Sequence, residues 1–493
     1  MLGGLYGQPL TLLTDLYQLS MAAAAFQEGI EREAAFHLLF RRAPFRSGFT
    51  VAAGLATALE YLRELRFTAD DLRYLGELRT DSGEAMFERG FLEHLRSLEL
   101  RLDVDAVPEG TVVFPQEPLL RVCGPVVPCM LLETPLLDLI NFQTLIATKA
   151  ARVCLAAAGQ PVLEFGLRRA QGVDGAVSAA RAAYIGGCSA TSDVLAGKLL
   201  GIPVKGTHAH SWVMLFDSER EAFDAYARAM PHNVVLLVDT YDSLQGVRNA
   251  IETGKRLRAQ GRDLSGIRLD SGDLAWLSIE ARKLLDAAGF TRTAILASNE
   301  LDEDVIASLK QQGARIDAWG VGTRLVTGAE DAALGGVYKL TAVREKDGPW
   351  KPRIKLSEQS AKISVPGILQ TRRFVAGGEF VGDLIYDVED GEPSRTLIDM
   401  LDVTRRKTVP PDAPHEELLV PVMRAGKIVY APPPLADSRE LTRQQIGHLH
   451  KGILRFVNPH QYPVGLDPTL HERRTRMILE ARASVPGGAP AGA

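Results

Sequence analysis

The chain has 493 residues, of which 46% are hydrophobic and 24% charged, and its formal net charge is −5. This composition is typical of globular proteins, and the length predicts two or three domains rather than a single core. The slight acidic excess and the lack of a long basic run exclude the usual electrostatic footprint of a nucleic-acid-binding protein.

Several features predict a cytoplasmic protein without a membrane partner. The first residues contain no basic segment followed by an apolar core, so no secretion signal is expected. The longest apolar segment, residues 131–158, contains four charged residues and predicts a soluble helix or helix pair. The cysteines lack CxxC spacing and indicate reduced thiols: Cys123, Cys129, Cys154 and Cys188.

Residues 1–130 predict an α+β domain. A helix is expected over residues 14–26, because Thr14 or Asp15 can cap it and an alanine run of high helix propensity follows. The other predicted elements are a strand over residues 34–42, an amphipathic helix over residues 56–65, and short strands between residues 98 and 123.

From residue 161 to about residue 345, short apolar runs alternate with helical stretches. The runs begin near residues 162, 182, 203, 234, 266, 294 and 318. Such alternation predicts parallel strands joined by helical crossovers. Seven or eight units over this length favour an irregular (β/α) barrel, which with its leading helices covers residues 131–345. An open doubly wound sheet is the alternative, but it usually carries a GxGxxG or Walker A sequence, and the chain has neither.

The alternation stops after residue 345. Residues 346–485 predict antiparallel strands, among them residues 370–375 and 380–386, and a helix over residues 435–451. We expect this region to pack with the N-terminal domain. Residues 486–493 are small residues, Gly and Pro, and predict a disordered tail.

A pair of histidines lies in the sequence Lys205-Gly-Thr-His-Ala-His-Ser-Trp212, which follows the apolar run at residue 202. If the segment stays extended, His208 and His210 point to the same side, because strand side chains alternate. Paired imidazoles at a strand end suit chemistry near neutral pH. The alternative is that both are satisfied polar residues at the end of a strand.

The other predicted strand ends also carry polar residues, which a barrel brings to the rim where such folds place their active sites. These positions combine cations, carboxylates, polar side chains and glycines: Glu164, Phe165, Arg168, Arg169, Asp239, Asp242, Arg268, Asp270, Asp273, Ser298, Asn299, Gly320, Gly322, Thr323 and Arg324. Taken singly they have structural alternatives, since Asp242 and Asp273 can cap helices and the glycines can form a turn. Taken together they suit an anionic substrate with a metal ion.

Particular groups on this rim suit phosphate chemistry. Gly320-Val-Gly-Thr-Arg predicts a phosphate cradle, because glycine lets backbone N–H groups approach an oxyanion. Asp239 and Asp270 can hold Mg²⁺ together with substrate oxygens. Arg168 and Arg268 suit a pyrophosphate-bearing ligand.

Eight segments, taken in chain order, resemble the nicotinate phosphoribosyltransferase family. They are Thr14-Asp-Leu-Tyr-Gln, Phe40-Arg-Arg-Ala-Pro-Phe, Glu164-Phe-Gly-Leu-Arg-Arg-Ala-Gln-Gly, Gly206-Thr-His-Ala-His-Ser, Val238-Asp-Thr-Tyr-Asp, Ile267-Arg-Leu-Asp-Ser-Gly-Asp-Leu, Gly320-Val-Gly-Thr and Gly335-Gly-Val-Tyr-Lys-Leu. The resemblance implies the irregular barrel of type II phosphoribosyltransferases and an α+β domain built from both ends of the chain. It also implies synthesis of nicotinate mononucleotide and pyrophosphate from nicotinate and 5-phosphoribosyl 1-diphosphate, the first step of NAD salvage from nicotinate.

The same resemblance implies Mg²⁺, a homodimer with shared sites, and ATP hydrolysis coupled to the reaction through a phosphohistidine. His210 matches the phosphorylated position, whereas His208 falls on a variable one. Phe165 and, from the other subunit, Tyr17 match residues that stack on the pyridine ring. The remaining matches bind substrate or metal: Thr207, Ser298, Arg168, Arg268, Asp239, Asp270, Gly320, Gly322 and Thr323. Which of Arg168 and Arg268 meets the nicotinate carboxylate stays open.

Two positions depart from the family pattern, since Ser189 and Asp193 stand where Asp and Asn are expected. The related nicotinamide enzyme carries an acidic residue in this region, so Asp193 bears on whether the enzyme selects nicotinate or nicotinamide. The alternative functions are a phosphoribosyltransferase for nicotinamide or quinolinate, a Schiff-base aldolase barrel using Lys205 beside Glu164, and a non-catalytic nucleotide-binding module.

Overall fold

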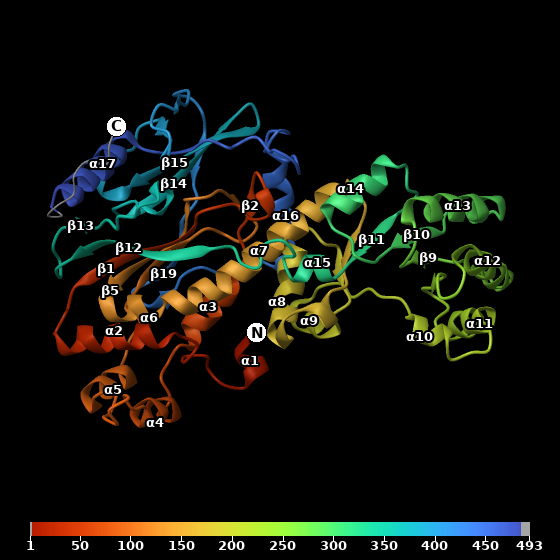
Figure 1. Ribbon diagram of the computed structural model, residues 1–493, viewed down its shortest axis with the longest axis horizontal. Helices are drawn as coiled ribbons and strands as arrows, with labels where there is room; N and C mark the ends of the chain where they lie inside the picture. The colour runs from red at the N-terminus through yellow and green to blue at the C-terminus, as the bar shows by residue number, and fades with distance from the viewer. Residues whose placement is uncertain (1, 485–493) are drawn as a thin grey trace. The chain divides into compact units, whose positions relative to one another are not determined.

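The computed structural model describes residues 2–484, which form two compact units (Figure 1). The first unit combines Met1–Leu145 with Ala333–Ala493, and the second is Ile146–Ala332. The N-terminal and C-terminal parts of the described chain therefore belong to the same unit. The tail predicted at residues 486–493 lies outside the described residues.

The main sheet of the first unit is built around strand β1 (Glu33–Phe40), which confirms the strand predicted there. β1 pairs antiparallel with β12 (Gly336–Arg344) and with β5 (Pro118–Pro125). The strand order is β13-β12-β1-β5-β3-β19-β20. The other strands are β3 (Asp103–Ala106), β13 (Lys351–Pro352), β19 (Val420–Arg424) and β20 (Lys427–Ile428), with β2 (Thr50–Val51) and β4 (Val112–Val113) forming a separate pair.

Helices pack on this sheet through an apolar cluster that contains Leu19, Leu59, Phe36 and Leu38. The helices predicted at residues 14–26 and 56–65 are confirmed as α2 and α3. The helices of this part of the chain are α1 (Leu2–Tyr6), α2 (Leu16–Gln27), α3 (Leu55–Glu64), α4 (Ala69–Glu77), α5 (Arg89–Arg96), α6 (Val126–Leu131) and α7 (Glu133–Ala157).

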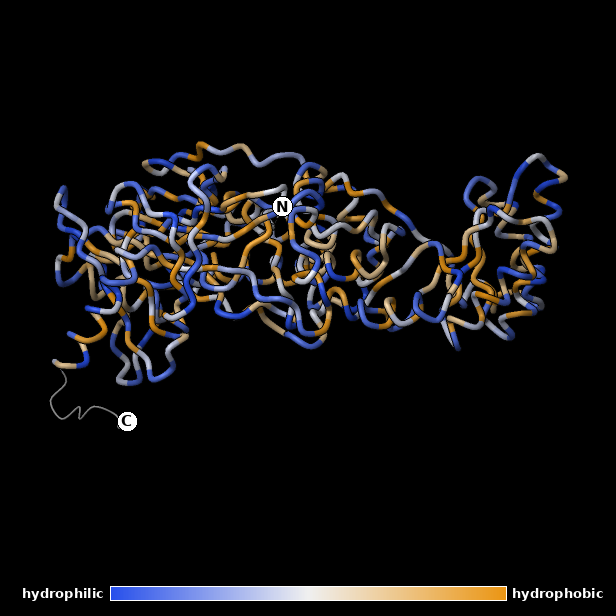
Figure 2. The backbone as a smooth tube through the Cα atoms, turned by 90° about the horizontal axis from the view of Figure 1, so that it is seen from above, coloured by the Kyte–Doolittle hydropathy of each residue, from blue (hydrophilic) through white to orange (hydrophobic). Residues whose placement is uncertain are grey.

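The stretch Val126–Ala157, which spans α6 and α7, is apolar and long enough to cross a membrane by length and composition, in a search of the described residues. In its most apolar window, however, 61% is buried inside the protein, and the core helix of a soluble protein passes the same test. Figure 2 shows short hydrophobic segments alternating with hydrophilic ones along the described chain. Of the two forms predicted at residues 131–158, a helix or a helix pair, the single helix is confirmed as α7, and α6 ends where that segment begins.

A second sheet, antiparallel except for one parallel pair of strands, completes the first unit. Strands β14 (Leu369–Ala376) and β15 (Glu379–Asp387) form its central hairpin, which confirms the antiparallel strands predicted there. The strand order is β17-β16-β21-β15-β14-β18. The remaining elements are β16 (Thr396–Ile398), β17 (Arg406–Thr408), β18 (His415–Glu417), β21 (Val464–Leu466), α16 (Leu435–Gly447) and α17 (Pro468–Ala483).

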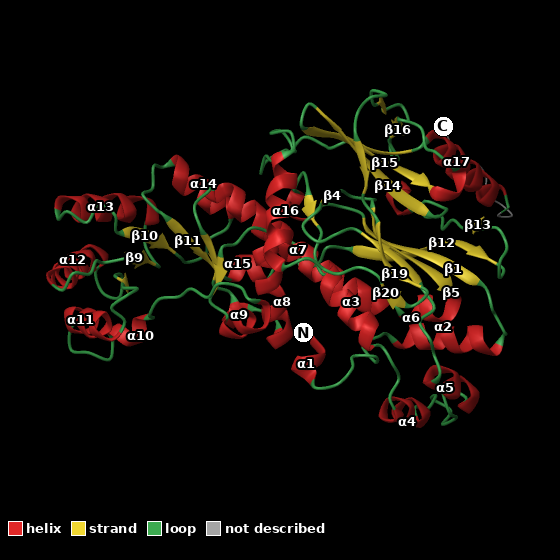
Figure 3. Ribbon diagram, turned by 180° about the vertical axis from the view of Figure 1, so that it is seen from behind, coloured by secondary structure: helices red, strands yellow, loops and turns green. Residues whose placement is uncertain are grey.

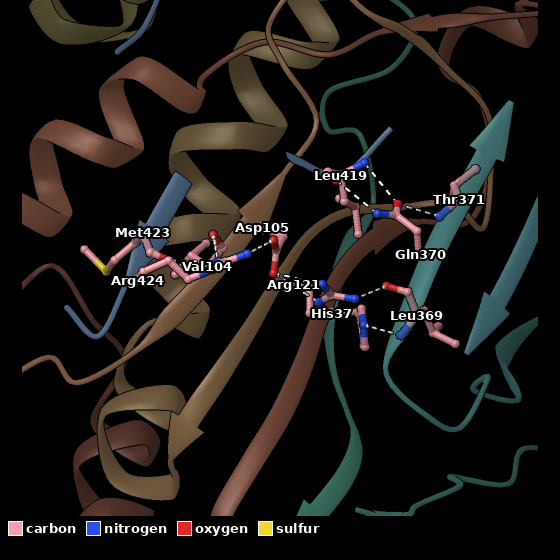
Figure 4. Close-up of polar contacts among 10 residues, drawn as sticks. All are labelled: His37, Val104, Asp105, Arg121, Leu369, Gln370, Thr371, Leu419, Met423 and Arg424. Atoms are coloured by element: carbon pink, nitrogen blue, oxygen red, sulfur yellow. Dashed lines mark hydrogen bonds and ion pairs between the residues drawn. The ribbon is translucent and has the colours of Figure 1, made fainter. Parts of the chain in front are cut away.

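A polar clip joins these two sheets at Leu369, the first residue of β14 (Figure 4). His37 Nε2 in β1 accepts the Leu369 N–H at 3.0 Å, and Arg121 Nη1 in β5 donates to the Leu369 carbonyl oxygen at 3.0 Å. His37 Nδ1 lies 2.9 Å from Thr341 Oγ1. Burial, together with the charge of Arg121, lowers the pKa of His37 well below its usual value. A neutral imidazole can accept the backbone proton, so both polar groups of a buried strand end are satisfied.

The second unit contains a parallel sheet with the strand order β7-β6-β11-β10-β9-β8. Figure 3 labels β9, β10 and β11 of this sheet. Its strands are β6 (Val162–Glu164), β7 (Ala190–Thr191), β8 (Val235–Leu237), β9 (Gly266–Leu269), β10 (Ala294–Ala297) and β11 (Ala318–Val321). The helices that follow the strands are α8 (Gly172–Ile185), α9 (Val194–Leu200), α10 (His210–Val213), α11 (Glu219–Ala229), α12 (Ser243–Ala259), α13 (Leu274–Ala287), α14 (Glu303–Gln311) and α15 (Thr323–Val326). Strands and helices alternate as the sequence predicted.

Two predicted runs of this unit fold differently. Residues 182–187 are mostly the end of helix α8, because alanine-rich sequence favours helix over strand. The run at residue 203 makes a single parallel bridge between Val204 and Thr191. The sheet consequently stops short of a complete ring within this fully described unit, as expected for an irregular barrel.

Candidate active site

Arg268 organises the carboxyl end of the parallel sheet. Its guanidinium donates to Ser298 Oγ at 2.7 Å, to Thr207 Oγ1 at 3.1 Å and to Asp270 Oδ1 at 2.9 Å. These partners follow β10, the bridge at Val204, and β9, respectively. One planar side chain therefore gathers groups from separate strand ends, which parallel strands bring to the same edge.

Asp239 and Asp270 lie next to each other at this edge. Asp239 Oδ2 accepts the backbone N–H of Asp270 at 2.8 Å and the Ser271 hydroxyl at 2.7 Å. Burial alone would raise the pKa of Asp270, but hydrogen bonds from Ser298 and the charge of Arg268 outweigh it and lower that pKa. Asp270 is therefore ionised at neutral pH.

His210 begins helix α10, and its side chain is 40% exposed. Its Nε2 lies 3.7 Å from Asp270 Oδ2, and its Nδ1 lies 3.2 Å from Thr240 Oγ1. The imidazole thus joins the carboxylate cluster while staying open to solvent. The two histidines were expected to point to the same side if their segment were extended, but residues 206–209 form no strand. His208 is instead buried, and its Nε2 accepts the Leu237 N–H at 3.2 Å.

Phe165 lies directly after β6 and is packed against the glycine segment that follows β11. A Cβ atom on Gly320 would approach the Phe165 ring to 2.6 Å, and one on Gly322 would lie 3.2 Å from the Phe165 carbonyl oxygen. The guanidinium of Arg268 lies 5.7 Å from the ring centroid. Glycine is required at position 320 because any side chain would displace the aromatic ring.

Several predicted residues make no hydrogen bond or ion pair with this cluster among the described residues, or have other partners. Arg168 is exposed and has no hydrogen bond or ion pair among the described residues. Asp242 and Asp273 cap helices α12 and α13, which is their structural alternative. Thr323 Oγ1 lies 3.4 Å from Glu300 Oε1. Tyr17 belongs to α2 of the first unit and is 49% exposed.

Glu164 and Lys205 do not form the pair that the aldolase alternative requires. Both carboxylate oxygens of Glu164 are occupied, one by the Gly166 N–H and the other by the Thr191 hydroxyl at 2.5 Å. Burial raises the pKa of Glu164. Lys205 is exposed, and its backbone N–H donates to Thr191 O at 3.0 Å.

Asp193, the residue that departs from the family pattern, is 2% exposed at the start of α9. Its Oδ1 accepts the N–H groups of Leu195 at 2.9 Å and Ala196 at 3.0 Å. Its Oδ2 is buried without a hydrogen-bond partner among the described residues. Asp193 therefore caps helix α9 with Oδ1, while its Oδ2 has no hydrogen-bond donor among the described residues.

Thr240 and Ser271 complete the cluster, although the sequence did not single them out. Each directly follows a predicted aspartate, Asp239 and Asp270 respectively. Hydroxyl residues immediately after strand-end carboxylates were the signal that could have found them. Their contacts depend on the folding of separate strands to one edge, which residue order alone does not specify.

The carboxylates fit a magnesium ion on the basis of one observation. Asp239 Oδ1 is buried and has no hydrogen-bond partner among the described residues. Mg²⁺ is commonly held by one or two carboxylates, with the other positions filled by water and substrate oxygens. No group of three or more His, Cys, Asp or Glu ligands occurs among residues 2–484, so substrate oxygens would have to complete the shell.

The fold and the site together are those of an enzyme with alternating strands and helices, in which an anionic substrate binds at the carboxyl edge of the parallel sheet. A family model for the nicotinate phosphoribosyltransferase N-terminal domain matches residues 12–141, and one for the C-terminal domain of that enzyme matches residues 370–474. The nicotinate phosphoribosyltransferase of Bacillus subtilis is 40% identical over 98% of both chains. The chain belongs to the nicotinate phosphoribosyltransferase family.

Further relatives agree with this assignment. A nicotinate phosphoribosyltransferase of Mycobacterium tuberculosis is 41% identical over 92% of this chain and 91% of its own length. The crystal structure of human nicotinic acid phosphoribosyltransferase superposes with a TM-score of 0.82 at 33% identity, covering 94% of this chain and 99% of the human one. The likeness extends over both units.

Proposed function

We propose that this protein joins nicotinate to 5-phosphoribosyl 1-diphosphate, forming nicotinate mononucleotide and pyrophosphate. The single observation that carries the proposal is the cluster of Arg268, Asp270 and His210 at the carboxyl edge of the sheet, in a chain of this family. The reaction is the first step of NAD biosynthesis from nicotinate. We place it in the cytoplasm, as the cysteine pattern suggests.

The transfer step needs positioning and charge stabilisation. As the bond between ribose C1 and pyrophosphate breaks, positive charge develops on the sugar and the leaving pyrophosphate takes the electron pair. Arg268 is oriented by Ser298, Thr207 and Asp270 to face an anion at this edge. The nicotinate nitrogen then forms the new bond to C1, and the Phe165 ring offers one face for stacking on the pyridine.

We assign the remaining substrate contacts by position. Gly320, Gly322 and Thr323 are proposed to bind the ribose 5′-phosphate, since the backbone there comes close to Phe165 without side chains in between. Arg168 is available for the nicotinate carboxylate or the pyrophosphate, because its guanidinium is exposed without a partner among the described residues. Arg268 is the alternative for the carboxylate.

ATP coupling is proposed to proceed through His210. An imidazole nitrogen attacks the γ-phosphorus of ATP, the bond to the β-phosphate oxygen breaks, and ADP leaves with the electron pair. Water later hydrolyses the N–P bond and releases inorganic phosphate. Exposure of the ring supports His210 for this role, whereas the Nε2 of His208 is buried and already accepts the Leu237 N–H.

Magnesium is proposed to be held by Asp239 and Asp270 together with phosphate oxygens. A bound Mg²⁺ would neutralise charge on the leaving pyrophosphate. The residues themselves prepare this position, because hydrogen bonds from Ser271 and the Asp270 N–H orient the Asp239 carboxylate.

A homodimer with shared sites is proposed from the surface of α2. Leu13 and three residues of α2, Leu16, Tyr17 and Met21, are 37–49% exposed and recur at helical spacing along one face. An exposed apolar face of this kind suits burial against another subunit. Tyr17 would then stack on the pyridine ring held by the partner.

Turnover of each pyridine tests the proposed function. Nicotinate, nicotinamide and quinolinate are each incubated with 5-phosphoribosyl 1-diphosphate and Mg²⁺, with and without ATP, and mononucleotide is quantified. We expect nicotinate to be preferred and ATP to stimulate its turnover. A preference for nicotinamide or quinolinate would overturn the choice of substrate, and absence of turnover with all three would overturn the proposal.

A further inference from the structure

The parallel sheet of the second unit has an opening between strands β7 and β8, at the two ends of its strand order. Thr191 in β7 begins to close it. The Thr191 N–H donates to Pro203 O at 3.0 Å, and Thr191 O accepts the Lys205 N–H at 3.0 Å. Beyond Lys205 the chain forms no strand before α10. An additional strand is therefore started along β7 and is not continued along β8.

His208 makes the contact at β8 that this strand would have made. The Val238 N–H donates to Arg268 O in β9 at 3.1 Å, so the preceding amide, Leu237, faces the opposite edge and the opening. Leu237 is 1% exposed, and its N–H donates to His208 Nε2 at 3.2 Å. Without the imidazole this buried donor would lose its acceptor, which proteins strongly avoid.

The surroundings of His208 suit this task. The residue is 8% exposed, and its ring meets the Tyr226 ring edge-on, with 4.8 Å between centroids. Burial lowers the pKa of His208, and the charges of Arg268 and His210 act in the same direction. The neutral ring that results carries its proton on Nδ1, which lies 3.3 Å from Ala209 O, and leaves Nε2 free to accept.

The segment held in this way carries His210. On one side of His208, Thr207 Oγ1 accepts from Arg268, and on the other, His210 Nδ1 contacts Thr240 Oγ1. Both of these contacts are only partly buried, whereas the bond between His208 and Leu237 is buried. The buried bond is accordingly the one that water competes for least.

We propose that His208 is a positioning residue: its imidazole replaces the missing strand pairing at β8 and holds His210 beside Thr240 and Asp270 for phosphoryl transfer. This inference rests on the proposed phosphorylation of His210 by ATP. His208 touches neither ATP nor the reacting phosphorus, and acts only through the segment that it anchors.

A matched pair of variants tests the role. His208→Gln places a carbonyl acceptor near the position of Nε2, whereas His208→Met has a similar length without a comparable acceptor. His232→Met serves as the control, because His232 is an exposed histidine of the same unit without a contact to the site. Each full-length protein is incubated with ATP and Mg²⁺, and acid-labile, base-stable phosphate on the protein is followed in time. Hydrogen exchange of the Leu237 amide is measured on the same samples.

We expect His208→Met to slow phosphate incorporation at least about tenfold and to accelerate exchange at Leu237, because the buried donor has lost its acceptor. His208→Gln should restore both to within about threefold of the wild type, and His232→Met should match the wild type. Equal incorporation in the Met and Gln variants, or protection of Leu237 in the Met variant, overturns the inference. A wild-type protein that takes up no phosphate overturns ATP coupling itself, and the exchange at Leu237 then still decides whether His208 closes the opening.

Discussion

Each unit of the protein buries a neutral histidine that accepts a backbone N–H from a neighbouring strand, but the two contacts have different consequences. In the first unit, His37 binds the Leu369 N–H while Arg121 binds the carbonyl oxygen of the same residue, so the two sheets are joined at that residue (Figure 4). In the second unit, His208 alone binds the Leu237 N–H at the edge of a sheet that stays open.

The comparison shows how sheet type decides where chemistry can occur. Strands in the first unit, most of them antiparallel, pair with neighbouring strands, and the bond between His37 and Leu369 in the polar clip is buried. Parallel strands in the second unit end at one edge, where Arg268, Asp270 and His210 meet with part of each side chain exposed. The same type of hydrogen bond thus stabilises the first unit and adjoins the candidate site in the second.

Among variants that test this difference between the two units, His210→Ala is expected to have the largest effect on activity. The variant should incorporate no phosphate from ATP, and ATP should no longer stimulate base transfer, because the exposed nucleophile is absent. Labelling with ATP followed by acid and base treatment measures this directly. If His208→Ala abolished labelling and His210→Ala did not, the assignment of the two histidines would be wrong.

A smaller but local effect is expected for Gly320→Ala. The new methyl group would lie 2.6 Å from the Phe165 ring, so the ring has to move, and overpacking of this kind costs about 1–3 kcal/mol. We expect the KM for nicotinate to rise about tenfold or more. Gly175→Ala is the matched control, because a Cβ atom there meets nothing within 4 Å. Steady-state kinetics at varied nicotinate concentration separate the two, and an unchanged KM for Gly320→Ala would remove Phe165 from the site.

In the first unit, His37→Leu should lower stability without changing the chemistry of the second unit. The Leu369 N–H loses its acceptor in the interior, which costs about 1–3 kcal/mol in the free energy of unfolding. Denaturant titration measures this cost. A variant as stable as the wild type would show that the clip does not hold the sheets together.

The pH dependence of the same variant provides a second check. Because burial lowers the pKa of His37 in the folded protein, the unfolded chain binds a proton that the folded protein does not. The wild-type free energy of unfolding therefore falls as the pH drops through the unfolded histidine value of about 6.5. His37→Leu lacks this contribution, so the free energies of the two proteins should converge on acidification. A constant difference from pH 8 to pH 5 would contradict a neutral His37.

The smallest effect is expected for Tyr17→Ala. If the exposed ring stacks on nicotinate in a partner subunit, its loss removes about 0.5–1.5 kcal/mol and raises the KM for nicotinate several-fold. Kinetics on samples of known oligomeric state, determined by light scattering, make the measurement. A fully active monomer would rule out the shared site.

Local patterns in the sequence were sufficient for most of the elements. The alternation of apolar runs and helices predicted parallel strands with crossovers, and it did so because periodicity reflects burial along a short stretch. It failed at residues 182–187, where alanines that are apolar enough for a strand continue helix α8 instead. Helix caps were also within reach, since Asp242 and Asp273 each precede a helical pattern.

By itself, the sequence determined the family, the order of the elements and the polar residues at the strand ends. The tertiary structure alone decided which of these residues touch one another: that Arg268 links Ser298, Thr207 and Asp270, that Thr240 contacts His210, and that His208 turns inward while His210 stays exposed. The reason is physical. Periodicity depends on neighbours a few residues apart, whereas the inward orientation of His208 depends on the Leu237 N–H, in a strand about thirty residues away, which becomes available because the sheet does not close.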